Sequence, residues 1–263
     1  TEKVVPAVVE FVDIAGLVKG ASKGEGLGNR FLAHIRETDL IVHVVRCFED
    51  DDITHVNGSI DPVDDIETVN VELALADLES VQKRLARLEK EKKVNDKDQA
   101  KRAAAAEPVV LKLQGALEDG KAARSVPLTD EERDLIRDLH LITMKRIIYL
   151  CNVDEDGLSG PSEKVGAVEE YAAEEGAKVM RISGKLEAEI ADLEDLEERA
   201  AFLEDAGLEE SGLHHLIREA YAALGLRTFF TAGPKEVRAW TFREGAKAPE
   251  AAGVIHTDFQ KGF

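Results

Sequence analysis

The chain has 263 residues, of which 44% are hydrophobic and 33% are charged, and its formal net charge is −19. This length suits one large domain or two to three smaller ones. The acidic balance excludes a protein that coats nucleic acid over its whole surface, but it allows a local basic patch. No apolar run approaches the roughly 20 residues of a membrane span. Cys47 and Cys151 lack metal-type spacing, which indicates reduced core thiols in a cytoplasmic protein.

The first part of the chain predicts strands that alternate with loops and a helix. Residues 4–14, rich in Val and Phe, predict a buried strand, and residues 40–48 predict another. Between them, residues 17–29 are glycine-rich, which favours a loop. Residues 31–37 have helical spacing. Residues 50–65 are acidic and rich in turn formers, so they predict a loop.

From residue 66 the hydrophobic period becomes that of helices. Apolar side chains recur at steps of three and four along one face of a long helix: Val71, Leu75, Leu78, Val81, Leu85 and Leu88. Residues 102–119 predict a further helix, broken or restarted near Pro108. Thr129 to Glu132 forms a capping box that opens a helix through about Leu141. Residues 66–141 therefore predict an antiparallel helical hairpin inserted into an α/β chain.

The remaining segments resume the alternation of strands and helices. They are strands at 145–153 and 178–182, helices at 162–175, 187–206 and 211–224, and a β-hairpin at 228–242. Ser211 is the expected N-cap of its helix. Such alternation predicts a parallel sheet with crossover helices. Ligands bind beyond the carboxyl ends of strands in these sheets, so the chemistry should lie directly after each strand.

The first candidate site is Asp13-Ile14-Ala15-Gly16, after the first predicted strand. An Asp at a strand end can hold a Mg²⁺ shell, in this case through water, and the backbone N–H of Gly16 can approach a γ-phosphate. Hydrolysis would then release the glycine-rich loop that follows. This short motif is weak alone, and its placement between a strand and that loop strengthens it.

Two further loops supply candidates for base recognition. Switch-type GTPases have Asn-Lys-x-Asp where this chain has Asn152-Val153-Asp154-Glu155, and the longer Glu155 should weaken selectivity for guanine. The loop Ser183-Gly184-Lys185 matches the Ser-Ala-Lys loop that lies over the base edge in switch domains. Each loop alone could be an ordinary polar connection, but the order and spacing of all three motifs fit one template.

This order of motifs resembles the YchF/Obg-like ATPase family, a translation-factor-related branch of P-loop NTPases, over essentially the whole chain. The resemblance is carried by the runs at 9–29, 31–36 and 237–242. It implies an ATPase, since the family has Asn-x-x-Glu where GTPases have Asn-Lys-x-Asp. The implied fold is a mostly parallel α/β sheet of the P-loop NTPase type, with an inserted antiparallel coiled coil and a C-terminal β-grasp module of the TGS type.

The resemblance also implies domain limits. Residues 1–65 and 142–226 match the nucleotide-binding domain, residues 66–141 match the inserted coiled coil, and residues 227–263 match the first part of the TGS module. The family's phosphate-binding loop, GxxxxGK[ST], is expected to precede Thr1. The run from Gly115 to Lys121 has similar spacing, but Ala122 follows it and it lies in a predicted helix, so we reject it.

Without the phosphate-binding loop, the backbone cradle and its lysine are missing. These 263 residues alone should therefore bind ATP poorly and hydrolyse it hardly at all, whereas the full-length protein should be active. The two remaining alternatives are a non-catalytic binding module, formed by the hairpin and the TGS segment, and a true GTPase.

The residue that orients the attacking water must differ from the usual one. Ras-like switches place a Gln directly after DxxG, where this chain has Leu17. His34 is our candidate, because a neutral imidazole can orient water or accept a proton near pH 7. The alternative is a helix-face histidine packed beneath the preceding loop. His43 lies inside a predicted strand, and the adjacent His214 and His215 cannot both face one site, so we interpret these three as structural or exposed.

Charge is unevenly distributed along the chain. Residues 83–102 contain nine Lys or Arg and four Asp or Glu, a local balance of +5 that leaves −24 for the rest. This basic stretch is either a solvated helix face or a salt-sensitive contact to the phosphates of ribosomal RNA. The TGS segment is a second candidate ribosome contact. Residues 187–210 carry eleven acidic residues and predict a solvated face.

Overall fold

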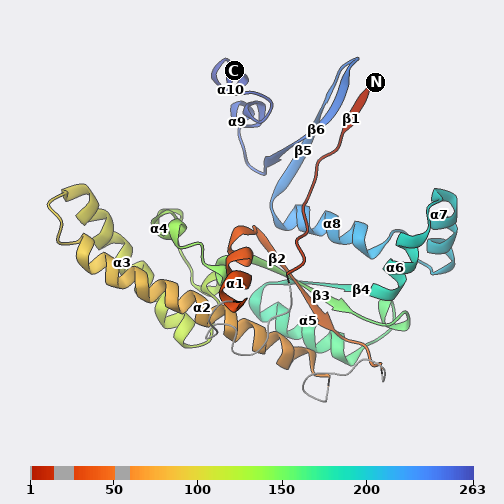
Figure 1. Ribbon diagram of the computed structural model, residues 1–263, viewed down its shortest axis with the longest axis horizontal. Helices are drawn as coiled ribbons and strands as arrows, with labels where there is room; N and C mark the ends of the chain where they lie inside the picture. Colours follow the sequence, from red (N-terminus) through yellow and green to blue (C-terminus); the bar gives the residue numbers. More distant parts are fainter. Residues whose placement is uncertain (1, 15–26, 51–59) are drawn as a thin grey trace. The chain divides into compact units, whose positions relative to one another are not determined.

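The computed structural model describes residues 2–14, 27–50 and 60–263 (Figure 1). The chain forms two compact units, one of Ile14–Gly184 and one that joins Thr1–Asp13 to Lys185–Phe263. Among the described residues, no helix is long and apolar enough to cross a membrane. The unit Ile14–Gly184 contains all the residues of the two loops predicted to recognise the base except Lys185, and it is described first.

A three-stranded parallel sheet forms the centre of the first unit. Its order is β2-β3-β4, with β2 at Leu40–Arg46, β3 at Arg146–Asn152 and β4 at Lys178–Ile182. The three strands run in the same direction, so their carboxyl ends meet at one edge, as the sequence predicts. The helix α5 (Glu163–Glu175) links β3 to β4 and buries its apolar residues against the sheet.

The short helix α1 (Leu27–Glu37) precedes β2. Its residues Leu32 and Ile35 are buried in a cluster with Leu73 and Ala76, so two positions three apart anchor one face of the helix. The prediction of a helix at 31–37 is therefore confirmed.

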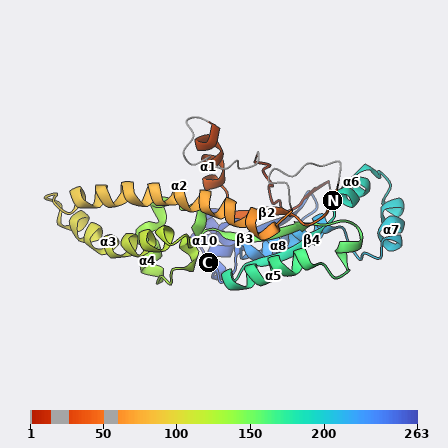
Figure 2. The same ribbon diagram turned by 90° about the horizontal axis from the view of Figure 1, so that it is seen from below.

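The predicted helical hairpin is present and consists of α2 (Pro62–Glu91) and α3 (Lys97–Glu118). Figure 2 shows the two helices side by side and antiparallel. Their interface buries Val81 and Leu88 of α2 and Ala106, Val110 and Leu113 of α3. This apolar seam stabilises both helices, because each buries its apolar face against the other and leaves its polar face in solvent.

Helix α2 starts earlier than predicted. Asp61 is its N-cap, with Oδ1 accepting hydrogen bonds from the backbone N–H groups of Val63 and Asp64 at 3.1 and 3.2 Å. Pro62 occupies the first turn, where its missing N–H costs nothing. Ile66 in the second turn is fully buried in the core of the sheet. The first turns of α2 therefore cover the sheet, and the same helix continues outward as one arm of the hairpin.

The predicted break at Pro108 is wrong, since α3 runs unbroken through it. Pro108 removes one intrahelical hydrogen bond, and its side chain lies on the exposed face of the helix. The neighbouring Val109 and Val110 are buried against α2. Packing along the hairpin seam thus outweighs the lost hydrogen bond, as tertiary contacts commonly do.

The helix after the hairpin is shorter than predicted. The capping box at Thr129 and Glu132 is confirmed, and it opens α4 (Asp130–Ile136). The chain then tightens into the 3₁₀ turn η3 (Arg137–Leu139) and reverses at His140, which has a left-handed φ of 44°. Two more 3₁₀ turns flank this region, η2 (Ala123–Ser125) and η4 (Ile142–Met144).

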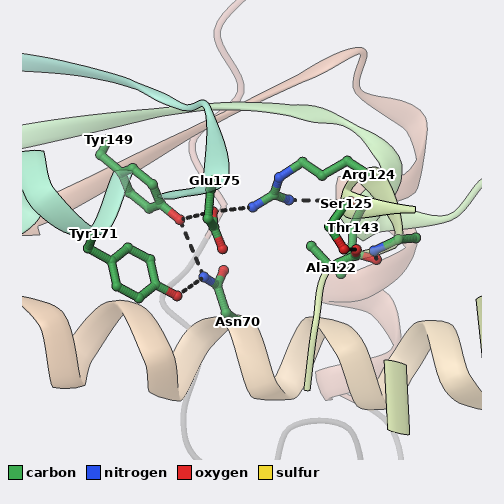
Figure 3. Close-up of polar contacts among 9 residues, drawn as sticks. Asn70, Ala122, Arg124, Ser125, Thr143, Tyr149, Tyr171 and Glu175 are labelled. Carbon is green, nitrogen blue, oxygen red and sulfur yellow. Dashed lines mark hydrogen bonds and ion pairs between the residues drawn. The ribbon is translucent and has the colours of Figure 1, made fainter. Parts of the chain in front are cut away.

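A polar network ties the helical hairpin to the sheet (Figure 3). Asn70 of α2 donates to the hydroxyls of Tyr149 and Tyr171 at 3.3 and 3.1 Å. Tyr149 of β3 donates to the Glu175 carboxylate at 2.9 Å, and Arg124 of η2 reaches the same oxygen at 2.5 Å. Burial raises the pKa of Tyr149, so its hydroxyl remains a donor. The network fixes the base of the hairpin against β3 and α5.

The second unit contains a three-stranded sheet of order β1-β6-β5 and several helices. Its elements are β1 (Lys3–Val5), α6 (Gly184–Asp192), α7 (Leu196–Asp205), α8 (Gly212–Ala223), β5 (Leu226–Ala232), β6 (Glu236–Arg243), α9 (Ala248–Gly253) and α10 (Thr257–Lys261). The antiparallel pair β5–β6 confirms the predicted hairpin. Ser211 caps α8 as predicted, with its hydroxyl accepting from the N–H of His214.

The predicted buried strand at residues 4–14 is wrong. Only Lys3–Val5 is a strand, and it pairs in parallel with β6 instead of joining the sheet of the first unit. Pro6 has no N–H to donate, so the pairing stops there. Beyond it the described residues are irregular, and Val8 is 78% exposed. A β-prone sequence becomes a strand only where a neighbouring strand supplies hydrogen-bond partners.

Candidate functional site

The two predicted base-recognition loops meet at the carboxyl edge of the parallel sheet. Asn152, the last residue of β3, accepts a hydrogen bond at its Oδ1 from the N–H of Gly184 at 2.9 Å. A side chain at Gly184 would place its Cβ 3.3 Å from this amide, so glycine permits the close approach. Ser183 is 2% exposed directly below. The structure thus brings Asn152, Ser183 and Gly184 together.

The other predicted residues of the two loops, Val153, Glu155 and Lys185, have different surroundings. Val153 is buried in the core between the sheet and α5, and its N–H donates to the carbonyl of Ile182 at 2.8 Å. An apolar residue at this position therefore supports the loop from beneath. Lys185 is exposed at the start of α6, with its Nζ 4.0 Å from Glu189. The Glu155 side chain is also exposed.

The loop after Asn152 folds back on itself in a tight turn that contains η5 (Asp156–Leu158). Asp154 accepts a hydrogen bond from the N–H of Gly157 at 2.8 Å. A Cβ at Gly157 would lie 2.9 Å from that carboxylate, and one at Gly160 would lie 2.6 Å from the carbonyl of Asp156. Arg181 of β4 donates to the carbonyls of Gly157 and Gly160 at 3.2 and 2.7 Å.

Arg181 was missed by the sequence interpretation. Its signal was an arginine in the otherwise apolar end of the strand at 178–182, which predicts a specific partner for a charge on a half-buried strand. The glycines at 157 and 160 were a second signal, because two glycines so close together mark a constrained loop.

The residues predicted to contact the phosphates begin with Asp13. Asp13 is exposed, lies in an irregular stretch and belongs to the other compact unit. Its proposed role in holding Mg²⁺ through water stays a prediction. Gly16 and Leu17 lie outside the described residues. In the described part of the chain, no group of three or more His, Cys, Asp or Glu could hold a metal ion.

His34 lies on α1 with its side chain exposed, while Leu32 and Ile35 on the same helix are buried. The alternative, a histidine packed beneath the preceding loop, involves residues 17–26, which lie outside the described residues. The role of His34 in positioning water stays a prediction.

Comparison with known proteins identifies the family. The chain is 55% identical over 264 residues to the "Ribosome-binding ATPase YchF" of Bacillus subtilis, and the match covers 100% of this chain and 71% of that protein. The chain belongs to the YchF/Obg-like ATPase family. Residues 2–95 match a family model described as "50S ribosome-binding GTPase", and residues 226–263 match the model YchF-GTPase_C, described as a protein of unknown function.

Two more relatives support this assignment. The "Obg-like ATPase 1" of Gallus gallus is 44% identical over 264 residues, covering 98% of this chain and 65% of that protein. The solved structure of the Schizosaccharomyces pombe YchF GTPase matches with a TM-score of 0.84 and 37% identity, covering 100% of this chain and 70% of that one. The mixed α/β fold with a parallel sheet, a helical insertion and a C-terminal TGS-like part is therefore confirmed.

The three histidines that were set aside, His43, His214 and His215, have structural or exposed positions, as predicted. His43 of β2 lies beside Tyr149, with ring centroids 5.8 Å apart. Burial lowers the pKa of His43 to about 4, so it is neutral near pH 7. His214 is exposed on α8, and His215 lies 3.4 Å from the Glu219 carboxylate.

The segment from Gly115 to Lys121, which was rejected as a phosphate-binding loop, has a structural position, as predicted. Gly115 lies within α3, and Gly120 ends that helix with a left-handed φ of 76°. Lys121 is exposed and lies 3.7 Å from Asp119. Helix α3, and not a strand, leads into this segment, so its backbone does not form the cradle that phosphate binding needs.

The basic stretch at the end of the hairpin is split between paired and unpaired cations. Four basic side chains form ion pairs within the hairpin: Lys83, Arg84, Arg87 and Lys92. The other five are exposed and have no ion pair within the described part of the chain: Lys90, Lys93, Lys97, Lys101 and Arg102. We call these five the tip cations. They surround the turn between α2 and α3.

Proposed function

We propose that this chain carries the base-recognition and switch segments of an ATP-hydrolysing switch protein that binds the ribosome. The observation that carries the proposal is the hydrogen bond from Gly184 to Asn152, which joins the two base-recognition loops at one sheet edge. Relatives named as ribosome-binding ATPases support both the reaction and the partner. The free, buried thiols of Cys47 and Cys151 agree with a cytoplasmic location.

Each site residue has a proposed role in this reaction. Asn152, Glu155 and the loop Ser183-Gly184-Lys185 hold the base, and Val153 supports their loops from the core. Asp13 holds Mg²⁺ through water, and the backbone of Gly16 contacts the γ-phosphate of ATP. When bound, Mg²⁺ would neutralise charge that develops on the phosphates.

Glu155 is central to the choice between adenine and guanine. Guanine presents a ring N–H and an amino group side by side, and an Asp positioned for both selects it. The longer Glu155 carboxylate is displaced by one methylene, which suits a single donor such as the amino group of adenine. The names of the relatives differ on this point, since the S. pombe protein is called a GTPase and the B. subtilis protein an ATPase.

Shortening this side chain tests the assignment. In the full-length protein, Glu155→Asp should reduce the preference for ATP over GTP by about tenfold or more, because a displaced acceptor loses a hydrogen bond to adenine. Competition of the two nucleotides for binding measures the preference. Glu163→Asp, on α5 outside the loop, is the matched control. Preferential binding of GTP by the unaltered protein would contradict the proposal and support the true GTPase.

These 263 residues contain no complete GxxxxGK[ST] motif. We therefore expect the chain alone to hydrolyse ATP at least about 10²-fold more slowly than the full-length protein, because the phosphate cradle and its lysine supply much of the stabilisation of the transition state. Steady-state phosphate release measures both rates. Equal rates would show that the cradle is dispensable, and inactivity of both proteins would favour a non-catalytic binding module.

The tip cations are the proposed contact to ribosomal RNA. Replacing Lys93 and Lys97 by glutamine should weaken ribosome binding and reduce the slope of log K against log salt by about 0.7–0.9 per lost phosphate contact. Co-sedimentation with ribosomes at several salt concentrations measures the slope. Lys83→Gln is the matched control, because Lys83 already pairs with Glu79. An unchanged slope in the double variant would indicate a solvated helix face.

A further inference from the structure

We infer that Arg181 is a positioning residue for base recognition, because it holds the loop that carries Glu155. The guanidinium Nη1 donates to the carbonyl oxygen of Gly160 at 2.7 Å and to that of Gly157 at 3.2 Å. Both carbonyls belong to the turn that follows Asn152. The inference rests on the proposed function and names a residue that the motif of the family does not include.

The turn has little freedom to adopt another path. The N–H of Gly160 donates to the carbonyl of Asp156 at 3.0 Å, and the N–H of Leu158 donates to the carbonyl of Glu155 at 3.3 Å. A side chain at Gly160 would overlap the Asp156 carbonyl. Because the second of these bonds ends on the carbonyl of Glu155 and the first on that of its neighbour Asp156, the backbone position of Glu155 depends on how the rest of the turn is held. Among the described residues of the sheet, Arg181 is the one whose side chain donates hydrogen bonds to the carbonyls of Gly157 and Gly160.

Arg181 also connects the two base-recognition loops. Its strand β4 leads within two residues into Ser183 and Gly184, and its Cα is paired with that of Cys151, the residue before Asn152. The first loop is therefore held to the second twice, by the hydrogen bond from Gly184 to Asn152 and by the guanidinium of Arg181. These two attachments fix the distance between the two loops that are proposed to bind the base.

A role limited to the surface is a weaker explanation of this arginine. Its Nη2 lies 3.4 Å from Glu169, whose side chain is 52% exposed, and exposed ion pairs of this kind contribute little. The bonds to the two carbonyls are shorter than this ion pair, and they come from one end of a planar charged group with several donors. The geometry thus favours loop positioning as the main role.

The test compares Arg181→Met, Arg181→Lys and Gly160→Ala with the unaltered full-length protein. Arg181→Met should raise KM and Kd for ATP about tenfold, the effect of losing a hydrogen bond from a charged group, and should narrow the preference for ATP over GTP. The turnover number at saturating ATP should stay unchanged, since the phosphate side is untouched. Arg181→Lys should recover part of the affinity, and Gly160→Ala should reproduce the loss by an independent route.

The control is Glu169→Gln, which removes the surface ion pair and leaves both carbonyl bonds, so it should retain the affinity and the preference. Unchanged KM and preference in both Arg181→Met and Gly160→Ala would overturn the inference. So would an equal loss in Arg181→Met and Glu169→Gln. If Glu155→Asp leaves the preference unchanged, the proposed function itself is wrong. If Glu155→Asp alters it but neither Arg181 variant does, only the role of Arg181 is wrong.

Discussion

Replacing His34 by alanine in the full-length protein should lower the turnover number for ATP hydrolysis by about 10²- to 10⁴-fold, the range typical of a lost general base, while ATP still binds. The residue after the DxxG motif is Leu17, whose side chain cannot orient water. His34 is exposed on α1 and has no side-chain partner within the described residues, so its imidazole is available. Single-turnover hydrolysis and equilibrium ATP binding, measured together, separate the chemical step from binding.

His214→Ala provides the matched control. His214 is exposed on a helix of the other compact unit, so its replacement should leave turnover unchanged. A His34→Gln variant adds a second comparison, since glutamine can hold a water but does not take up its proton. Turnover retained in His34→Ala would remove His34 from the mechanism. Loss of ATP binding in that variant would instead assign it a role in holding the nucleotide.

Elements with strong local signals could be predicted from the sequence. The capping box at Thr129 and the N-cap at Ser211 are made by side chains next to the helix they start, so their geometry is encoded within four residues. The strand at 146–152 has a continuous buried run from Ile147 to Cys151, as expected for a strand in the interior of a parallel sheet. In each case the interactions that define the element lie within it or follow directly from its hydrophobic pattern.

Elements that depend on distant partners could not be predicted in this way. Residues 6–14 have a strand-like composition, but the described chain offers them no neighbouring strand. Proline normally breaks a helix, yet α3 continues through Pro108 because its neighbouring residues pack against α2. The start of α2 at Asp61-Pro62 was readable as a cap followed by a first-turn proline, but the acidic character of 50–65 favoured a loop.

The candidate site shows the same division. The meeting of Asn152 with Gly184 follows from the order of two parallel strands, because the ends of such strands lie at one sheet edge. The grip of Arg181 on two backbone carbonyls depends on the path of the loop in space, which no spacing rule encodes. Residue type alone indicated only that the arginine needs a partner.

Replacing Asp77 by alanine should lower the free energy of unfolding by about 2–6 kcal/mol, the cost of leaving two buried backbone donors without an acceptor. Asp77 of α2 is 0% exposed. Its Oδ1 accepts from the N–H of Ile142 at 2.9 Å, and its Oδ2 accepts from the N–H and the hydroxyl of Thr143, both at 2.7 Å. Burial raises the pKa of Asp77, and the bonds from Thr143 and Ile142 oppose that rise.

The size of this effect comes from the donors that the substitution leaves behind. Two backbone N–H groups at the start of η4 would be buried without an acceptor, and each unsatisfied group costs about 1–3 kcal/mol. Thr143 also accepts from the N–H of Ala123 at 3.0 Å, so the loss extends to η2 at the base of the hairpin. Asp77→Asn should cost less, since its amide keeps one acceptor oxygen in place.

Urea unfolding followed by circular dichroism of the helices measures the change. Tryptophan fluorescence is less suitable, because the single tryptophan, Trp240, lies in the other compact unit. Glu79→Ala is the matched control on the same helix: its carboxylate is 58% exposed and pairs with Lys83 four residues on, an interaction of about 0.3–0.5 kcal/mol. Equal losses in the two variants would show that the buried carboxylate does not hold α2 to the chain entering β3.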